Sequence, residues 1–196
     1  MKKVFILMSV ALVAMFGLSS CNSDDQDEAM VLSGEWRGDW KMWYEDDFGH
    51  RFYAENTSLK LVPDHRYSTR GYGIQVDSYS HGEYRYLWYK FDWEVRNGII
   101  YIDYRYDDEL DTFIRDYRLD NNYFSGYFGN SSTRFRMAKI SDWYYNTPEI
   151  MVESDAYGWS LWSAHSKQFE QGAVAKANNQ ELPKIVKRGS KFTDPE

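Results

Sequence analysis

The sequence is poor in residues that cross-link or interrupt a chain. It has a single cysteine, Cys21, and four prolines in 196 residues. One cysteine cannot form a disulfide within the chain or build a cysteine-ligated metal site, so packing and hydrogen bonding have to hold the domain together. After residue 20 no apolar run approaches the roughly 20 residues that a membrane-spanning helix needs. The sequence therefore excludes a disulfide scaffold and a bundle of membrane helices.

The sequence motifs of common chemistries are also missing. No Gly-x-Ser-x-Gly or Ser-x-x-Lys element of acyl-transfer enzymes occurs. The acidic run at 107–111 lacks the spacing and central glycine of a calcium loop, so we interpret it as a solvated turn. The histidines stand in no metal-ligand spacing; they are His50, His65, His81 and His165. We expect no catalytic residue, no metal and no cofactor, and a hydrolase with a carboxylate pair is the alternative, because such a pair is defined by its separation in space.

The N-terminus is typical of a secretion signal. Lys2 and Lys3 precede an apolar run of about 15 residues, Val4 to Leu18, which is short for a membrane span. The run ends in Leu18-Ser19-Ser20-Cys21, which resembles the lipobox of bacterial lipoproteins, where the cysteine sulfur is acylated and becomes the new N-terminus. The resemblance implies that residues 1–20 are a cleaved signal peptide and that Cys21 is the lipid attachment site. We therefore expect an outer-membrane lipoprotein held by acyl chains.

The segment after the cysteine is polar and acidic. Residues 21–31 contain too little apolar surface to offset the entropy of ordering, so we expect a flexible tether. The Ser23-Asp24-Asp25 run close behind the cysteine is similar to the surface-export signal of lipoproteins in the Bacteroidetes group, which implies a cell-surface position; a periplasm-facing position is the alternative. Without Lys2 and Lys3 the formal charge changes from −7 to −9, which argues against a nucleic-acid partner.

Aromatic residues are abundant, with 17 Tyr, 11 Phe and 8 Trp, and they suit the half-buried surface of a sheet. The longest run is residues 83–95, in which every second residue from Leu87 to Val95 is aromatic or aliphatic and those between them include Lys90, Asp92 and Glu94. This period of two excludes a helix. Asn97-Gly98 then favours a tight hairpin. Similar runs separated by turn residues recur over residues 32–140. The sequence predicts an all-β domain there, an antiparallel up-and-down barrel of about eight strands, with a flattened sandwich as the alternative.

Several segments resemble lipocalin-like lipoproteins of gut Bacteroidetes. They are Leu32-Ser33-Gly34-Glu35-Trp36, with its Gly-x-Trp signature, and the runs 93–100, 114–119 and 124–126. The resemblance implies a calycin-type barrel in which Trp36 packs at the closed end under an arginine of the last strand. Arg134 and Arg136 are the two candidates for that arginine, in a cation–π contact of about 0.5–2 kcal/mol.

The last segment, residues 141–196, departs from the strand pattern. Residues 164–177 are rich in Ala, Lys, Gln and Glu, and they predict a short helix that Gly172 weakens. The polar tail from Pro183 onward is expected to fray. We therefore treat this segment as a C-terminal extension that is partly helical.

Four aromatic residues are the candidates for lining a ligand cavity at the open end of the barrel: Trp40, Tyr89, Trp93 and Tyr104. Tyr and Trp combine an apolar body with a polar group, which suits a small hydrophobic or aromatic ligand, or a glycan. Arg115 is in register with Phe113 and Tyr117. If it points inward, it either binds a ligand carboxylate or forms an internal ion pair.

An alternative function is that of an accessory module in an outer-membrane assembly. Trp43, Tyr86 and Trp88 lie off the predicted core face, and exposed aromatic residues at this density mark a contact surface for a protein or a glycan. Such a module would dock through this outer aromatic face or through the C-terminal extension.

Overall fold

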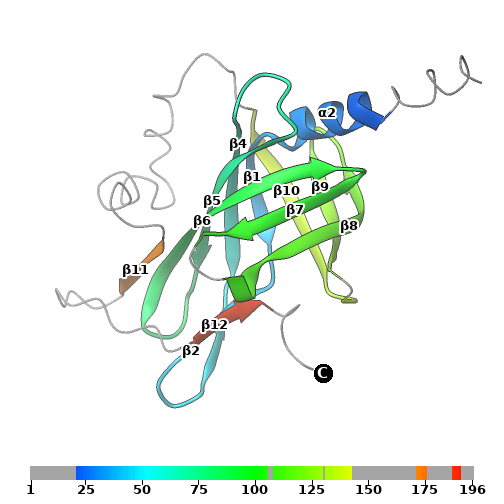
Figure 1. Ribbon diagram of the computed structural model, residues 1–196. Coiled ribbons are helices and arrows are strands. Elements are labelled where there is room, and N and C mark those ends of the chain that lie inside the picture. The colour runs from blue at the N-terminus through cyan, green and yellow to red at the C-terminus, as the bar shows by residue number, and fades with distance from the viewer. Residues whose placement is uncertain (1–20, 106–107, 130, 143–170, 176–186, 191–196) are drawn as a thin grey trace, which may run out of the picture.

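The computed structural model describes residues 21–105, 108–129, 131–142, 171–175 and 187–190. Its main feature is a closed antiparallel barrel of eight strands (Figure 1). The strands are β1 (Gly34–Asp39), β4 (Asn56–Pro63), β5 (Arg70–Ser78), β6 (Tyr84–Arg96), β7 (Ile99–Tyr104), β8 (Thr112–Leu119), β9 (Tyr123–Phe128) and β10 (Arg134–Ser141). Each strand pairs with the next in this order, and β10 returns to β1. The prediction of an all-β, up-and-down barrel is confirmed, and the flattened sandwich is not formed.

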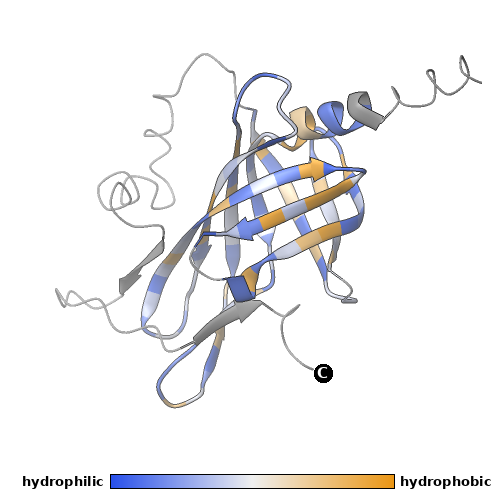
Figure 2. Cartoon of the chain, viewed as in Figure 1, coloured by the Kyte–Doolittle hydropathy of each residue, from blue (hydrophilic) through white to orange (hydrophobic). Residues whose placement is uncertain are grey.

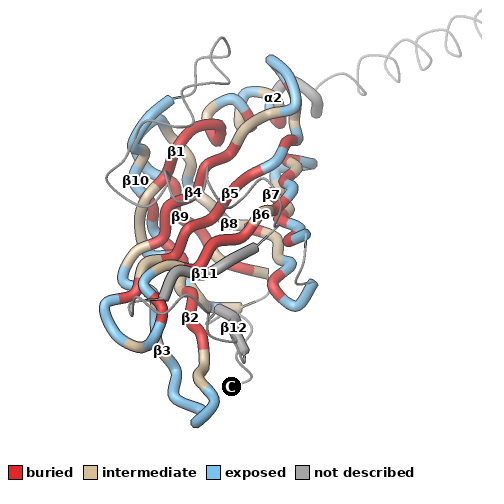
Figure 3. The backbone as a smooth tube through the Cα atoms, turned by 90° about the vertical axis from the view of Figure 1, so that its left-hand side faces the viewer, coloured by how far each residue is buried: buried red, intermediate tan, exposed pale blue. Residues whose placement is uncertain are grey.

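Inward and outward residues alternate along the barrel strands except at bulges, and hydropathy changes from residue to residue along many strands in Figure 2. Figure 3 shows that β1, β4 and β5 also carry long stretches that are buried on both faces. In β6 the inward side chains are buried: Leu87, Tyr89, Phe91, Trp93 and Val95. Asn97 and Gly98 have φ values of 55° and 67° and form the tight turn to β7 that the sequence predicts.

Two additional pairings extend the sheets. β2 (Met42–Glu45) and β3 (Arg51–Tyr53) form a hairpin between β1 and β4, and β12 (Lys187–Ser190) pairs with β2. β11 (Gln171–Ala175) pairs with the first half of β6, which β7 does not reach. Residues 171–175 are thus a strand, and the helix prediction for them is wrong: pairing with an open sheet edge outweighs a helix propensity already lowered by Gly172. Residues 187–190 of the tail predicted to fray from Pro183 are strand β12, so that prediction is wrong for them. The rest of the predicted helix, the other residues of the tail and the predicted signal peptide lie outside the described residues.

Helix α2 (Cys21–Leu32) closes one end of the barrel, where we expected a flexible tether. Two of its apolar side chains, Ala29 and Leu32, are fully buried in the core. Two carboxylates bind the barrel: Asp25 accepts hydrogen bonds from the β6–β7 turn, and Glu28 accepts one from the Tyr117 hydroxyl. The acidic side chains that suggest disorder are in part the groups that attach this helix.

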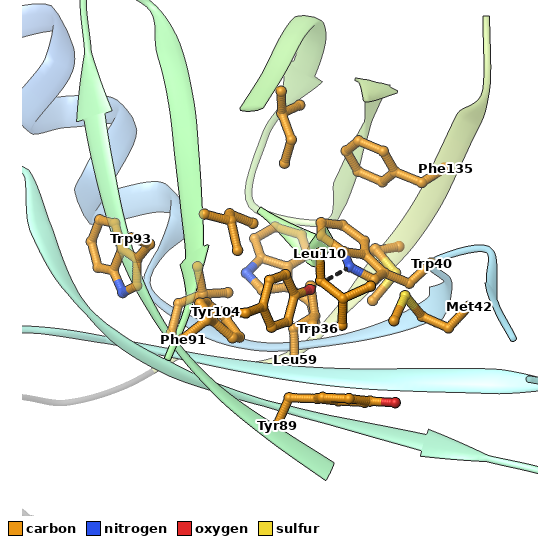
Figure 4. Packing of buried hydrophobic residues seen from close by; sticks show 14 of the residues in the cluster. Trp36, Trp40, Met42, Leu59, Tyr89, Phe91, Trp93, Tyr104, Leu110 and Phe135 are labelled. Atoms are coloured by element: carbon orange, nitrogen blue, oxygen red, sulfur yellow. Dashed lines mark hydrogen bonds between the residues drawn. The ribbon is translucent and has the colours of Figure 1, made fainter. Parts of the chain in front are cut away.

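Aromatic rings fill the centre of the barrel (Figure 4). The Trp40 ring centroid lies 4.8 Å from that of Phe128 and 4.7 Å from that of Phe135. Such pairs contribute about 0.5–1.5 kcal/mol each beyond the apolar area they bury. Gly34 begins β1 with a φ of 128°, and a Cβ there would lie 2.5 Å from the Ser141 carbonyl oxygen, so the Gly-x-Trp glycine is required by backbone geometry.

Candidate functional site

A chain of hydrogen-bonded polar side chains crosses the interior of the barrel in the half farther from α2. The Trp40 indole N–H donates to the Tyr104 hydroxyl at 3.3 Å, and that hydroxyl donates to the Gln75 side-chain oxygen at 2.5 Å. The Gln75 amide nitrogen lies 3.0 and 2.9 Å from the two carboxylate oxygens of Asp77, and the Thr57 hydroxyl donates to Asp77 at 2.5 Å. We call these five residues the interior network.

Four elements place these side chains together. Thr57 on β4 is the cross-strand partner of Asp77 on β5, and Gln75 shares the inward face of β5 with Asp77 because it stands two residues away. Tyr104 ends β7, and Trp40 follows β1 directly. All five are buried, with Gln75 and Asp77 at 0 % exposure. The network is therefore held by the barrel strands and does not depend on a surface loop.

Burial sets the protonation of the tyrosine in this network. Burial raises the pKa of Tyr104 far above its ordinary value; the Trp40 hydrogen bond lowers this pKa and the negative charge of Asp77 raises it further. Tyr104 therefore stays a neutral hydroxyl that donates to Gln75. The interior network presents a fixed direction of hydrogen bonding, from Trp40 at one end to the Asp77 carboxylate at the other.

A cluster of aromatic rings joins the β2–β3 hairpin to the start of β6. The Tyr44 ring is stacked on Phe52 at 5.0 Å and makes edge contacts with Tyr79 at 4.9 Å and Tyr84 at 4.8 Å. The backbone N–H of Tyr84 donates to the Tyr44 hydroxyl at 3.3 Å. Burial raises the pKa of Tyr44, against the opposing effect of that hydrogen bond. This end of the barrel is thus rich in rings that carry hydroxyl groups.

Three of the four predicted cavity residues come together. Tyr104 is bonded to Trp40, and its ring centroid lies 6.0 Å from that of Tyr89. Trp93 lies apart from them, at the α2 end, where its indole N–H donates to the Tyr72 carbonyl at 3.0 Å (Figure 4). All four are at most 3 % exposed. Trp93 thus lies away from the other three, because β6 carries it past Tyr89 toward the α2 end of the barrel.

Arg115 lies on the outside of the barrel, which corrects the expectation of an inward cation. Its Nε donates to the Gly129 carbonyl at 2.6 Å and its Nη1 pairs with Asp116 at 2.6 Å, with the side chain 40 % exposed. The cause is a bulge in β8, where Asp116 has a φ of 49° and the pairing with β9 shifts. Ile114 points inward before the bulge, and Tyr117 reaches the Phe124 ring after it.

The cation at Trp36 is a lysine, which corrects the choice between Arg134 and Arg136. Both arginines are exposed, because they share the outward face of β10. Lys139 is the cross-strand partner of Trp36, and its Nζ lies 5.1 Å from the centroid of the Trp36 ring. The same Nζ donates to the Val31 carbonyl of α2 at 2.8 Å. The contact implied by the family resemblance thus forms with a different residue.

The predicted outer aromatic face is largely buried. Trp88 is 7 % exposed and packs with Ile74 and Val76 in a second apolar cluster outside the barrel, with Tyr86 against it. Trp43 is 2 % exposed, and the Arg51 guanidinium carbon lies 4.3 Å from its ring centroid. These aromatic residues therefore do not offer the exposed contact surface that the alternation along the strands suggests.

Sequence reasoning missed three members of the interior network, Thr57, Gln75 and Asp77. The reason is that β5 carries its apolar residues, Ile74 and Val76, on the outer face, so a hydropathy pattern orients the strand the wrong way. A usable signal exists in the pairing with β6: the inward residues of β5 include Gly71 and Gly73, which stand opposite Trp93 and Phe91. A Cβ at Gly73 would lie 2.2 Å from the Phe91 ring. Small and polar residues on this face fit against the large rings of β6.

One pair of carboxylates bears on the hydrolase alternative. Asp92 and Asp103 are cross-strand partners on the outer face of β6 and β7. Burial raises the pKa of Asp103, and the negative charges of Asp92 and Glu94 raise it further. Arg105 binds Asp92 through two hydrogen bonds of 3.1 and 2.7 Å. This pair lines neither of two clefts among the described residues, one on the outer side of β4–β5 and one between α2 and β8.

Within the part of the chain that the structure describes, no three His, Cys, Asp or Glu side chains are placed to hold a metal ion. Over the same residues, no helix has the length and apolar character to cross a membrane. Searches of protein-family models, curated proteins and solved structures find no match to this chain. The resemblance to lipocalin-like lipoproteins stays a prediction from the quoted residues.

Proposed function

We propose that this protein is a membrane-anchored, non-enzymatic barrel that binds a small hydrophobic or aromatic ligand, or a glycan, at the barrel end opposite α2. The observation that carries the proposal is the interior network beside the tyrosine-rich end. Burying a carboxylate with its polar partners is costly, and apolar side chains of similar volume are often at least as stabilising. A network kept at that cost supports a use in recognition.

The arrangement indicates what such a ligand would offer. Gln75 and Asp77 carry acceptor oxygens, so a ligand hydroxyl or N–H group could take the place of one of the internal donors at these oxygens. The rings of Tyr89 and Tyr104 lie beside the same groups and suit the apolar or planar face of a ligand. A molecule with one aromatic or apolar face and a few hydrogen-bond donors matches both features.

The ligand test uses the mature protein and its own tryptophans. Bile acids, fatty acids, haem and oligosaccharides are titrated while tryptophan fluorescence is recorded, because Trp40 is part of the network. We expect at least one class to change the emission, and Tyr104→Phe to weaken its binding about tenfold, which corresponds to loss of one hydrogen bond of about 1.4 kcal/mol. Tyr123→Phe, on an exposed tyrosine, is the matched control. Silence of the whole panel with the native protein contradicts the proposal.

The membrane part of the proposal is tested separately. Acylation of Cys21 is expected to appear as a lipid-modified N-terminal peptide by mass spectrometry of the protein from its native membrane. Cys21→Ser is expected to move the protein into the aqueous fraction. The variant has no sulfur to acylate, and it therefore lacks the acyl chains that stable anchoring needs. Surface exposure is checked by protease treatment of intact cells, with a periplasmic protein as control. An unmodified cysteine in membrane-bound protein would remove the anchor.

A second candidate function, docking on an outer-membrane protein, is favoured by one surface. Phe48 at the tip of the β2–β3 hairpin is 84 % exposed, and Tyr53 on β3 is 47 % exposed. Exposed aromatic residues of this kind are common anchors of protein interfaces. A photoreactive amino acid at position 48 should cross-link to one defined envelope protein in living cells, and one at position 72 should not. Equal labelling at both positions would speak against this function.

A further inference from the structure

We infer that the α2 end of the barrel rests on the headgroup layer of a zwitterionic phospholipid surface, so that the β2–β3 hairpin and the interior network face away from the membrane. The inference rests on the proposed acylation of Cys21 and adds the orientation of the barrel and the surface that touches the lipid. Three independent features of the described residues support it: the fixed attachment of α2, the distribution of exposed apolar side chains, and the charge at this end.

The first feature is that α2 is fixed to the barrel near the acylation site. Asp25 accepts the backbone N–H groups of the β6–β7 turn, Glu28 accepts the Tyr117 hydroxyl, and the Val31 carbonyl accepts the Lys139 ammonium. Cys21 begins this helix, one turn before Asp25 or about 6 Å along the helix axis. An acyl group on Cys21 would therefore leave the chain beside the barrel end, with no free linker between them.

The second feature is where large apolar side chains are exposed. Seven such side chains are exposed among the described residues, and five of them lie on α2 or near the strand ends next to it: Met30, Tyr67, Tyr72, Tyr123 and Ile140, at 40, 52, 36, 55 and 48 %. They come from α2, the β4–β5 loop, β5, β9 and β10, so separate parts of the chain present them on one end. Tyrosine is favoured at the level of lipid headgroups, where its ring is partly apolar and its hydroxyl stays hydrated.

The third feature is the charge at this end. Three arginines of this end stand in ion pairs with neighbouring carboxylates: Arg70 with Asp64 at 3.4 Å, Arg96 with Glu94 at 3.5 Å and Arg118 with Asp120 at 3.3 Å. A fourth, Arg66, is exposed, with its guanidinium carbon 5.1 Å from the centroid of the Tyr67 ring. α2 adds exposed acidic side chains, Asp24 and Asp27. A surface of paired charges with a small acidic excess matches zwitterionic headgroups and is repelled by an anionic lipid layer.

An open cleft at the same end also suits contact with a phospholipid. It lies between α2 and β8, has a volume of about 410 Å³, and is lined by Val31, Tyr117 and Leu119 with Asp27, Glu28 and Arg118 at its polar side. Apolar and charged groups thus lie side by side in a cleft that would face the lipid. Headgroup and glycerol portions of a phospholipid carry the same combination.

The experiment uses the full lipoprotein in phosphatidylcholine vesicles that contain a headgroup-attached nitroxide quencher. Single cysteines are introduced as Y67C, Y123C and F48C and labelled with a fluorophore; an acylated Cys21 leaves no other thiol to react. We expect quenching at positions 67 and 123 to exceed that at position 48 at least threefold. D25A should reduce this difference, because it releases α2 from the β6–β7 turn.

The outcomes separate this inference from the anchor itself. Acylated protein in which position 48 is quenched as strongly as positions 67 and 123 overturns the orientation and leaves the anchor in place. Stronger quenching at position 67 in phosphatidylglycerol vesicles than in phosphatidylcholine vesicles overturns the zwitterionic match. A protein without lipid on Cys21 by mass spectrometry removes the anchor on which the inference rests.

Discussion

Asp25 binds the turn at Asn97 across 72 residues of sequence: its carboxylate accepts the backbone N–H of Asn97 at 2.9 Å and that of Gly98 at 3.0 Å. Both amides belong to a tight turn, and Asp25 is only 8 % exposed. A charged acceptor that serves two backbone donors makes hydrogen bonds of about 1.5–3 kcal/mol. This contact fixes the helix that closes the barrel.

The first prediction concerns that contact. Asp25→Ala should lower the free energy of unfolding by about 2 kcal/mol, because two backbone donors lose their acceptor. Asp25→Asn should lower it less, since one acceptor oxygen remains. Urea denaturation followed by tryptophan fluorescence measures both variants. Asp27→Ala, on an exposed position of the same helix, serves as control and should change stability by less than about 0.5 kcal/mol. Equal effects at positions 25 and 27 would contradict the assigned contact.

The second prediction concerns the cation at Trp36. Lys139→Met should lower the free energy of unfolding by about 1–3 kcal/mol, because the variant loses both the contact with the Trp36 ring and the hydrogen bond to the Val31 carbonyl. Arg136→Met should be nearly neutral, since Arg136 points outward on β10. Thermal and chemical denaturation of the two variants provide the comparison. A larger loss for Arg136→Met would restore the arginine assignment.

The third prediction separates backbone strain from steric clash. Gly34→Ala should lower the free energy of unfolding by roughly 3 kcal/mol or more, because a positive φ of 128° is combined with a Cβ 2.5 Å from a carbonyl oxygen. Gly49→Ala is the matched control: its φ is 82° and no atom lies within 4 Å of the added Cβ, so only about 1 kcal/mol of strain is expected. Circular dichroism during urea denaturation measures both. Similar losses would mean that the start of β1 has room for a side chain.

The fourth prediction concerns alkaline pH. Burial raises the pKa of Tyr44, Tyr104 and Tyr117, and Glu28 raises that of Tyr117 further. In the unfolded chain these tyrosines lose their protons near pH 10, whereas the folded protein keeps them. Their contribution to stability is thus complete below pH 10 and is lost as the pH rises above 10, at a slope of roughly 1.4 kcal/mol per pH unit for each tyrosine that stays protonated.

Urea denaturation at pH 9, 10 and 11, with tyrosinate absorbance as a second signal, measures this slope. Tyr104→Phe should reduce the fall of stability with pH by roughly 1.4 kcal/mol per pH unit, the contribution of one tyrosine. Tyr123→Phe, on an exposed tyrosine, serves as the control. A stability that does not fall between pH 10 and 11 would contradict the protonated state of the buried hydroxyls.

The barrel could be predicted because its signals are local. The alternation from Leu87 to Val95 and the turn at Asn97-Gly98 depend only on neighbours in the sequence, and both are found as expected. The inward position of Trp36 follows from the same alternation. The predicted direction of a side chain, inward or outward, was wrong where a bulge inserts an extra residue into a strand. Arg115 is turned outward on β8, where the bulge at Asp116 places Ile114 and Tyr117 on the inner face.

By itself, the sequence determined that the chain forms an antiparallel barrel and where its tight turns lie, because strand alternation and turn chemistry act over a few residues. Only the tertiary structure decided that the acidic segment of Asp25 is a helix, that Lys139 covers Trp36, and that Gln75 and Asp77 meet Tyr104 inside the barrel. Each of these depends on a partner dozens of residues away, and a buried polar group is stabilised only when the closed barrel brings that partner within hydrogen-bond distance.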